Sequence, residues 1–146
     1  MDVSEGFRLG YIDVGFPDPR ETDGEIVAVG GDLSPEMLLS AYARGIFPWF
    51  SEDNPILWWS LDPRFVIVPE TFHVSKSLKK SIRRQKFIWT VDQAFARVIQ
   101  GCRETQRPDQ DGTWITDDMM HAYQALHELG YAHSVESWFN GELAGG

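Results

Sequence analysis

The stretch IVAVGGDLSPEMLLSAYARG, residues 26–45, contains a strand signal followed at once by a helix signal. Its first four residues, 26–29, form a short apolar run that two glycines end, which is typical of a strand and a tight turn. Ser34 is a preferred N-cap, Pro35 suits the first helical position, and Gly45 is a helix-stop residue. A strand and a capped helix this close together predict a small mixed α/β domain.

The residues that follow this helix are rich in aromatic side chains and proline. Seven aromatic residues lie from Tyr42 to Phe65, and three prolines among them prevent a continuous helix. We therefore expect loops and short extended pieces, with most rings filling the seam between two small layers. Trp49, between a proline and a phenylalanine at the helix exit, is the best candidate for a ring presented to a flat ligand such as a nucleobase.

A boundary is predicted at Asp62-Pro63, because short strands and helices alternate beyond it. FVIV, residues 65–68, predicts a strand, and Ser75 is expected to cap a helix whose apolar stripe docks against the rest of the domain. Residues 87–91 predict another strand. Asp92 is expected to cap the next helix, in which Cys102 lies on the apolar stripe as a small core residue.

The last third of the chain predicts a helix and a hairpin. Thr116 is expected to cap a helix that ends at Gly130 and buries Met119, Tyr123, Leu126 and Leu129. Residues 132–139 read as a strand, and Asn140-Gly141 is a strong hairpin turn signal. Few residues follow the turn, so we expect an α+β fragment, with a small domain at 1–62 and a partial second domain at 63–146 that ends within the hairpin.

The charges are distributed unevenly along the sequence. The chain has 13 Lys and Arg against 22 Asp and Glu, a net charge of −9, which by itself argues against a nucleic-acid partner. Six of the thirteen cations, however, lie within eleven residues that contain no acid, and they are Lys76, Lys79, Lys80, Arg83, Arg84 and Lys86. Such a cluster is suited to phosphate contacts, although a solvated helix face is the simpler explanation of charge alone.

Several classes of protein are excluded by composition. No apolar run approaches the roughly 20 residues of a membrane span, and the first residues have no pattern of a secretory signal. The single cysteine rules out an internal disulfide, and the four histidines lack metal-ligand spacing. We expect a cytoplasmic monomer that needs no metal and no other cofactor.

Four stretches carry a resemblance to a known family. They are GGDLSPEMLLSAYARGIFPWF (30–50), PILWWSLDPR (55–64), GTWIT (112–116) and HELGYAHS (127–134). Together they closely resemble the bacterial leucyl/phenylalanyl-tRNA protein transferases, in the order in which that family has them. The resemblance implies a small N-terminal domain followed by a domain of the acetyltransferase-like (GNAT) fold.

The resemblance also implies a reaction and a set of binding residues. Members of the family transfer Leu, Phe or Met from aminoacyl-tRNA to proteins with an N-terminal Arg or Lys, which marks those proteins for degradation. Trp49, Trp114 and Tyr123 match residues at the family's aminoacyl-adenosine site, and the basic cluster falls where the family has its basic helix. The family's catalytic segments would lie beyond Gly146, so no catalytic residue is assigned here and this chain alone is expected to be inactive.

Two other functions remain open at this point. One is a GNAT-type acyltransferase with a small acyl donor, which would need a pyrophosphate-binding turn after the hairpin. The other is a non-catalytic module that binds tRNA or another RNA.

Overall fold

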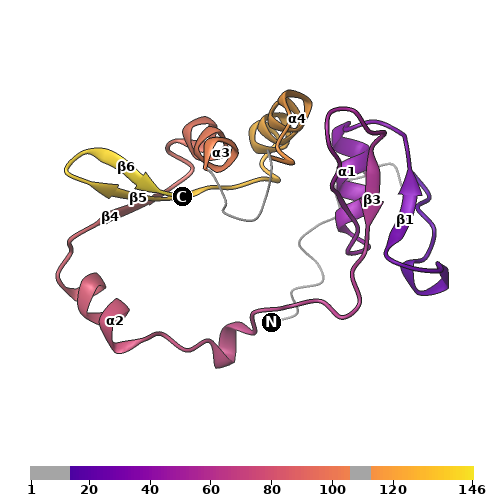
Figure 1. Ribbon diagram of the computed structural model, residues 1–146. Coiled ribbons are helices and arrows are strands. Elements are labelled where there is room, and N and C mark those ends of the chain that lie inside the picture. Colours follow the sequence, from indigo (N-terminus) through magenta and orange to yellow (C-terminus); the bar gives the residue numbers. More distant parts are fainter. Residues whose placement is uncertain (1–13, 106–112) are drawn as a thin grey trace. The chain divides into compact units, whose positions relative to one another are not determined.

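The computed structural model describes residues 14–105 and 113–146, and these divide between Asp62 and Pro63 into two compact units (Figure 1). Each unit contains helices together with a three-stranded antiparallel sheet, so the predicted α+β class is confirmed. No described helix has the length and apolarity needed to cross a membrane.

Within residues 14–62, the N-terminal unit contains one α-helix and a sheet with the strand order β1-β3-β2. Its elements in chain order are the short 3-10 helix η2 (Pro19–Glu21), β1 (Ile26–Val29), α1 (Pro35–Tyr42), β2 (Phe47–Pro48) and β3 (Leu57–Trp59). The predicted first strand and helix are confirmed. The Ser34 hydroxyl accepts a hydrogen bond from the Met37 amide at 3.4 Å, and Gly45 has a φ of 72°, which ends the helical turn.

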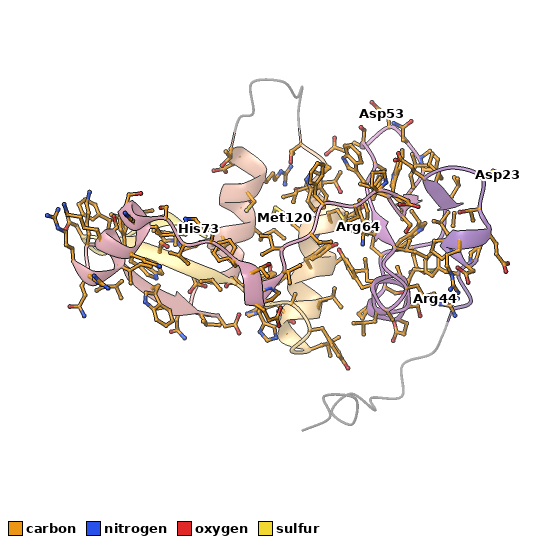
Figure 2. The ribbon with its side chains drawn as sticks, turned by 90° about the horizontal axis from the view of Figure 1, so that it is seen from below. Asp23, Arg44, Asp53, Arg64, His73 and Met120 are labelled. Carbon is orange, nitrogen blue, oxygen red and sulfur yellow. The ribbon has the colours of Figure 1, made fainter. Side chains whose placement is uncertain are left out.

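Trp58 is the largest side chain in the core of this unit, and it is 1% exposed. Its ring packs edge-on against Phe16, with centroids 4.9 Å apart, and its Nε1 donates to the Gly30 carbonyl at 2.9 Å. Arg44, labelled in Figure 2, follows α1, and its Nη1 donates to the Phe16 carbonyl at 2.7 Å. Trp58 thus connects β3 to the loop before β1, through Phe16, and to the loop after β1, through Gly30.

The C-terminal unit has the strand order β4-β5-β6 and, outside residues 106–112, three α-helices. In chain order it contains the 3-10 helix η3 (Pro69–Thr71), α2 (Lys76–Arg83), β4 (Ile88–Val91), α3 (Phe95–Glu104), α4 (Asp117–Glu128), β5 (Val135–Phe139) and β6 (Glu142–Gly145). The caps predicted at Ser75 and Thr116 are confirmed, since their side chains accept from the amides three residues further on. Asn140 and Gly141 both have positive φ, as a type I′ hairpin turn requires.

The strand predicted at residues 65–68 is wrong. The backbone there pairs with no strand among the described residues, and all four side chains are exposed. An apolar run indicates a strand only where a partner strand supplies the hydrogen bonds. The expected docking of the α2 apolar stripe is also wrong, because Leu78 and Ile82 are 47% and 59% exposed. The prediction that Leu129 is buried at the end of α4 is wrong too, since its side chain is exposed.

The cap predicted for α3 is also wrong, and a distant residue takes its place. Asp92 has a φ of 57°, and its carboxylate accepts from the Ser134 amide at 2.8 Å. The residue before α3, Ala94, has no side-chain acceptor. Instead Glu136 on β5, which is fully buried, accepts from the Gln93 and Ala94 amides, each at 3.2 Å. The sheet therefore supplies the cap of the helix.

Glu136 is held ionised by its neighbours. The hydroxyls of Ser134, at 2.5 Å, and of Thr90 donate to its carboxylate, and together with the two backbone amides they keep the pKa of Glu136 below its ordinary value although burial opposes this. A lowered folded pKa means that the stabilisation is present above the unfolded pKa of about 4.5 and is lost as the pH falls through the folded pKa.

Glu136→Gln should lower the melting temperature of the C-terminal unit at pH 7, because an amide cannot accept all four hydrogen bonds. The variant should also lose less stability than the parent between pH 5 and 3. Melting curves followed by circular dichroism over this pH range test both effects. Glu142→Gln on β6 is the matched control, since Glu142 is exposed; a similar pH response in both variants would contradict the role of Glu136.

Candidate nucleic-acid interface

The cations of the basic cluster gather on one side of α2 and on the turn after it. Lys76, Lys79, Lys80 and Arg83 follow the i, i+3, i+4, i+7 spacing that places side chains on one helix face. Arg84 is the C-cap, and Gln85, with a φ of 48°, ends the helix in the left-handed conformation. All six cationic residues from Lys76 to Lys86 are exposed. The helix thus presents a row of cations to solvent.

No acidic side chain neutralises this row within the described residues. Ion pairs occur elsewhere, such as Arg20 with Asp18 at 2.6 Å and Arg103 with Asp117, whereas none involves a cation of α2. Lys86, the last cation of the basic cluster, lies after the helix and has its Nζ 5.4 Å from the centroid of the Phe139 ring. Unpaired cations that share one face are the arrangement that binds the phosphates of a nucleic acid.

The other side of α2 is apolar and open. Leu78, Ile82 and the strand β4 line a groove of about 870 Å³ whose other lining residues are Ser81, Gln85, Phe87 and Ser137. The charged and apolar faces of the helix are therefore separated, as its sequence predicts, even though the apolar face is not buried.

Trp49 follows β2 and presents its ring, with 46% of its surface exposed. Its amide donates to the Leu57 carbonyl at 2.9 Å, so the backbone at this point is tied to β3. A partly exposed indole on a fixed backbone can stack on a flat ring such as a nucleobase.

Trp114 and Tyr123 belong to the C-terminal unit, whereas Trp49 belongs to the N-terminal unit. Trp114 is half-buried and lies two residues before the α4 cap, and Tyr123 is half-buried on α4 between the buried residues Met119 and Leu126. The structure brings the cations of the basic cluster together on one element. It describes the three aromatic candidates on separate elements of two units.

Two of the four histidines, His127 and His133, make side-chain hydrogen bonds in the C-terminal unit. His133 Nδ1 lies 2.7 Å from the Asp92 carboxylate, and this pairing raises the pKa of His133 and lowers that of Asp92. The His127 ring stacks on Phe95, with centroids 4.2 Å apart. Among the residues that the structure describes, no three His, Cys, Asp or Glu side chains gather as metal ligands, and Cys102 is half-buried on α3.

Sequence reasoning missed the contribution of Trp59, which was grouped with the rings expected to fill a seam. Trp59 is half-buried, and its Nε1 donates to the Trp49 carbonyl at 2.7 Å. A signal was present in the sequence: two adjacent tryptophans in one strand point to opposite faces, so they cannot both enter the same core.

The basic helix of the C-terminal unit and the exposed indole of the N-terminal unit each offer a kind of contact that nucleic acids make, to phosphates and to bases respectively. Comparison with known proteins gives the family. The model of the leucyl/phenylalanyl-tRNA protein transferase family matches residues 66–146, and the model of its N-terminal domain matches residues 31–62. The chain therefore belongs to the leucyl/phenylalanyl-tRNA protein transferase family.

Individual relatives agree with this assignment. The chain is 58% identical over 136 residues to the leucyl/phenylalanyl-tRNA–protein transferase of Anaeromyxobacter sp. (strain Fw109-5), a match that covers 92% of the chain and 57% of that protein. The enzymes so named in Myxococcus xanthus and Desulfatibacillum aliphaticivorans are 58% and 54% identical, over 90% of the chain and 56% and 57% of their own lengths. The chain thus spans a little over half the length of these relatives.

Proposed function

We propose that the protein functions in aminoacyl transfer, in which Leu, Phe or Met moves from aminoacyl-tRNA to the N-terminal Arg or Lys of an acceptor protein and marks that protein for degradation. Family membership supports this proposal, since the relatives carry the name of that enzyme. The α-amine of the acceptor attacks the ester carbonyl of the aminoacyl-tRNA. A C–N bond forms, the ester C–O bond breaks, and the 3′-terminal ribose hydroxyl of the tRNA leaves with a proton. This chemistry needs no metal and no other cofactor.

The tRNA phosphates bind to the basic face of α2 in this proposal. The observation that carries it is the row of exposed cations with no acidic partner in the described chain, at Lys76, Lys79, Lys80, Arg83, Arg84 and Lys86. Phosphate contacts position a nucleic acid without reading its sequence, which suits an enzyme that accepts tRNAs of more than one amino acid.

The aminoacyl-adenosine end of the tRNA binds to Trp49, Trp114 and Tyr123. The exposed ring of Trp49 supports this role, because unpaired RNA bases are recognised by stacking on aromatic side chains.

Residues 63–146 form part of a GNAT-like domain, and residues 1–62 form the small domain that precedes it. The second unit combines an antiparallel sheet with α-helices, which supports this proposal. The protein acts as a cytoplasmic monomer.

The test compares tRNA that carries phenylalanine with the same tRNA after deacylation. The 146-residue chain should bind phenylalanyl-tRNA more tightly, using an amide-linked form so that the ester does not hydrolyse during titration. Equal affinity for both would support an RNA-binding module and would contradict an aminoacyl site. Affinity that does not change with salt would contradict phosphate binding by α2.

Trp49→Ala should weaken binding of a non-hydrolysable phenylalanyl-adenosine amide about 5- to 150-fold, because stacking of one base on an aromatic ring contributes about 1–3 kcal/mol. Binding of whole tRNA should weaken less, since the phosphate contacts remain. Calorimetric titration measures both affinities. Trp89→Ala is the matched control, as Trp89 is a 70% exposed indole on β4; an equal loss in the two variants would refute a specific role for Trp49.

A further inference from the structure

The backbone of Trp49 is held at both of its polar groups by β3. Its amide donates to the Leu57 carbonyl at 2.9 Å, and its carbonyl accepts from Trp59 Nε1 at 2.7 Å. The second bond is unusual in origin, because it comes from a side chain and not from the strand ladder. Trp49 therefore has a fixed backbone at the point where β2 ends.

The two rings also contact each other. The centroids of Trp49 and Trp59 are 5.6 Å apart with planes inclined at 52°, a tilted packing within the range of favourable aromatic pairs. Trp58, the preceding residue of β3, is buried in the core, so the alternation of the strand directs Trp59 to the opposite face. Trp59 thus contacts Trp49 through its ring and through its Nε1 hydrogen.

We propose that Trp59 is a positioning residue: it fixes the orientation in which Trp49 presents its indole to the aminoacyl-adenosine. This inference rests on the proposed function of Trp49. A ring that is already ordered loses less conformational entropy when a base stacks on it, so preorganisation raises affinity without a new contact to the ligand. Trp59 acts through Trp49 and touches no part of the ligand.

The test is a double-mutant cycle on the 146-residue chain with the phenylalanyl-adenosine amide as probe. Trp59→Phe keeps a ring but removes the Nε1 donor, and it should weaken binding about two- to tenfold, the range expected for one hydrogen bond. In the background of Trp49→Ala the same substitution should have no further effect, because the ring that it positions is gone. Trp59→Tyr, which also lacks the indole donor, should behave in the same way.

A spectroscopic measurement separates positioning from a general loss of structure. With 5-fluorotryptophan incorporated, the resonance of Trp49 should shift and broaden in Trp59→Phe, while that of the buried Trp58 and the melting temperature should stay close to those of the parent chain. If Trp59→Phe weakens binding equally with and without Trp49, or does not weaken it at all, the positioning role is refuted. If Trp49→Ala itself leaves binding unchanged, the proposed function of Trp49 fails first.

Discussion

Reversing three charges of the basic helix, by Lys80→Glu, Arg83→Glu and Arg84→Glu together, is expected to weaken tRNA binding about 100- to 500-fold near 0.1 M salt. Each phosphate contact lowers the slope of log K against log salt by about 0.7–0.9, so three contacts account for about two to nearly three decades at this salt concentration. All three side chains are exposed and have no acidic partner in the described chain, so their replacement removes no ion pair that the fold requires.

The measurement is a salt titration of tRNA affinity with the parent chain and the triple variant. The salt slope should be shallower in the variant by about two to three. A control with reversals at Arg20, Arg64 and Arg97, which are all exposed, lowers the net charge by the same six units without touching α2. If the control weakens binding as strongly as the triple variant, net charge governs the interaction and the basic helix is not the phosphate site.

Trp58→Ala is expected to destabilise the N-terminal unit severely. Removing a fully buried tryptophan costs about 3–5 kcal/mol, and here the Gly30 carbonyl also loses its Nε1 donor and Phe16 loses its edge-on ring contact. A unit of this size has a total stability of only about 3–9 kcal/mol at typical values per residue. The substitution therefore removes between about a third and all of the free energy of unfolding of this unit.

Denaturant unfolding followed by circular dichroism measures this effect, with Trp58→Phe and Trp89→Ala as comparisons. Trp58→Phe keeps a ring in the core and should be much less damaging, whereas Trp89→Ala alters an exposed side chain and should change stability by no more than about 0.5 kcal/mol. The affinity for phenylalanyl-adenosine amide should be lost in Trp58→Ala as well, because β3 carries the backbone that holds Trp49. A chain that keeps both its stability and its affinity would contradict the assignment of Trp58 as the core anchor.

Local signals in the sequence predicted most of the secondary structure. Ser34, Ser75 and Thr116 cap helices as expected, and Asn140-Gly141 forms the hairpin turn, because each acts on amides or dihedrals within a few residues. The predictions that were wrong concern elements whose formation depends on residues far away in the sequence. The run at 65–68 has no partner strand in the described chain, and the cap of α3 comes from Glu136, more than forty residues away.

Local patterns likewise predicted the parts of the candidate site that depend on neighbouring residues. The basic face of α2 follows from helical spacing alone, and the exposure of Trp49 follows from its place between a proline and a phenylalanine at a helix exit. The part played by Trp59 depends on the pairing of β2 with β3, and no local pattern states which residues a strand will meet. The roles of Trp114 and Tyr123 stay predictions from the family resemblance.

The capping of α3 by Glu136 has a consequence for synthesis of the protein on the ribosome. Residues 95–104 are made before residue 136, so α3 is synthesised before the acceptor for the amides of Gln93 and Ala94, the two residues that lead into it. Until β5 pairs with β4, this helix of ten residues lacks that support, and an isolated helix of this length is only marginally stable in water. We expect α3 to become stable late and together with the sheet, as a single step of folding during translation, even though it lies in the middle of the chain.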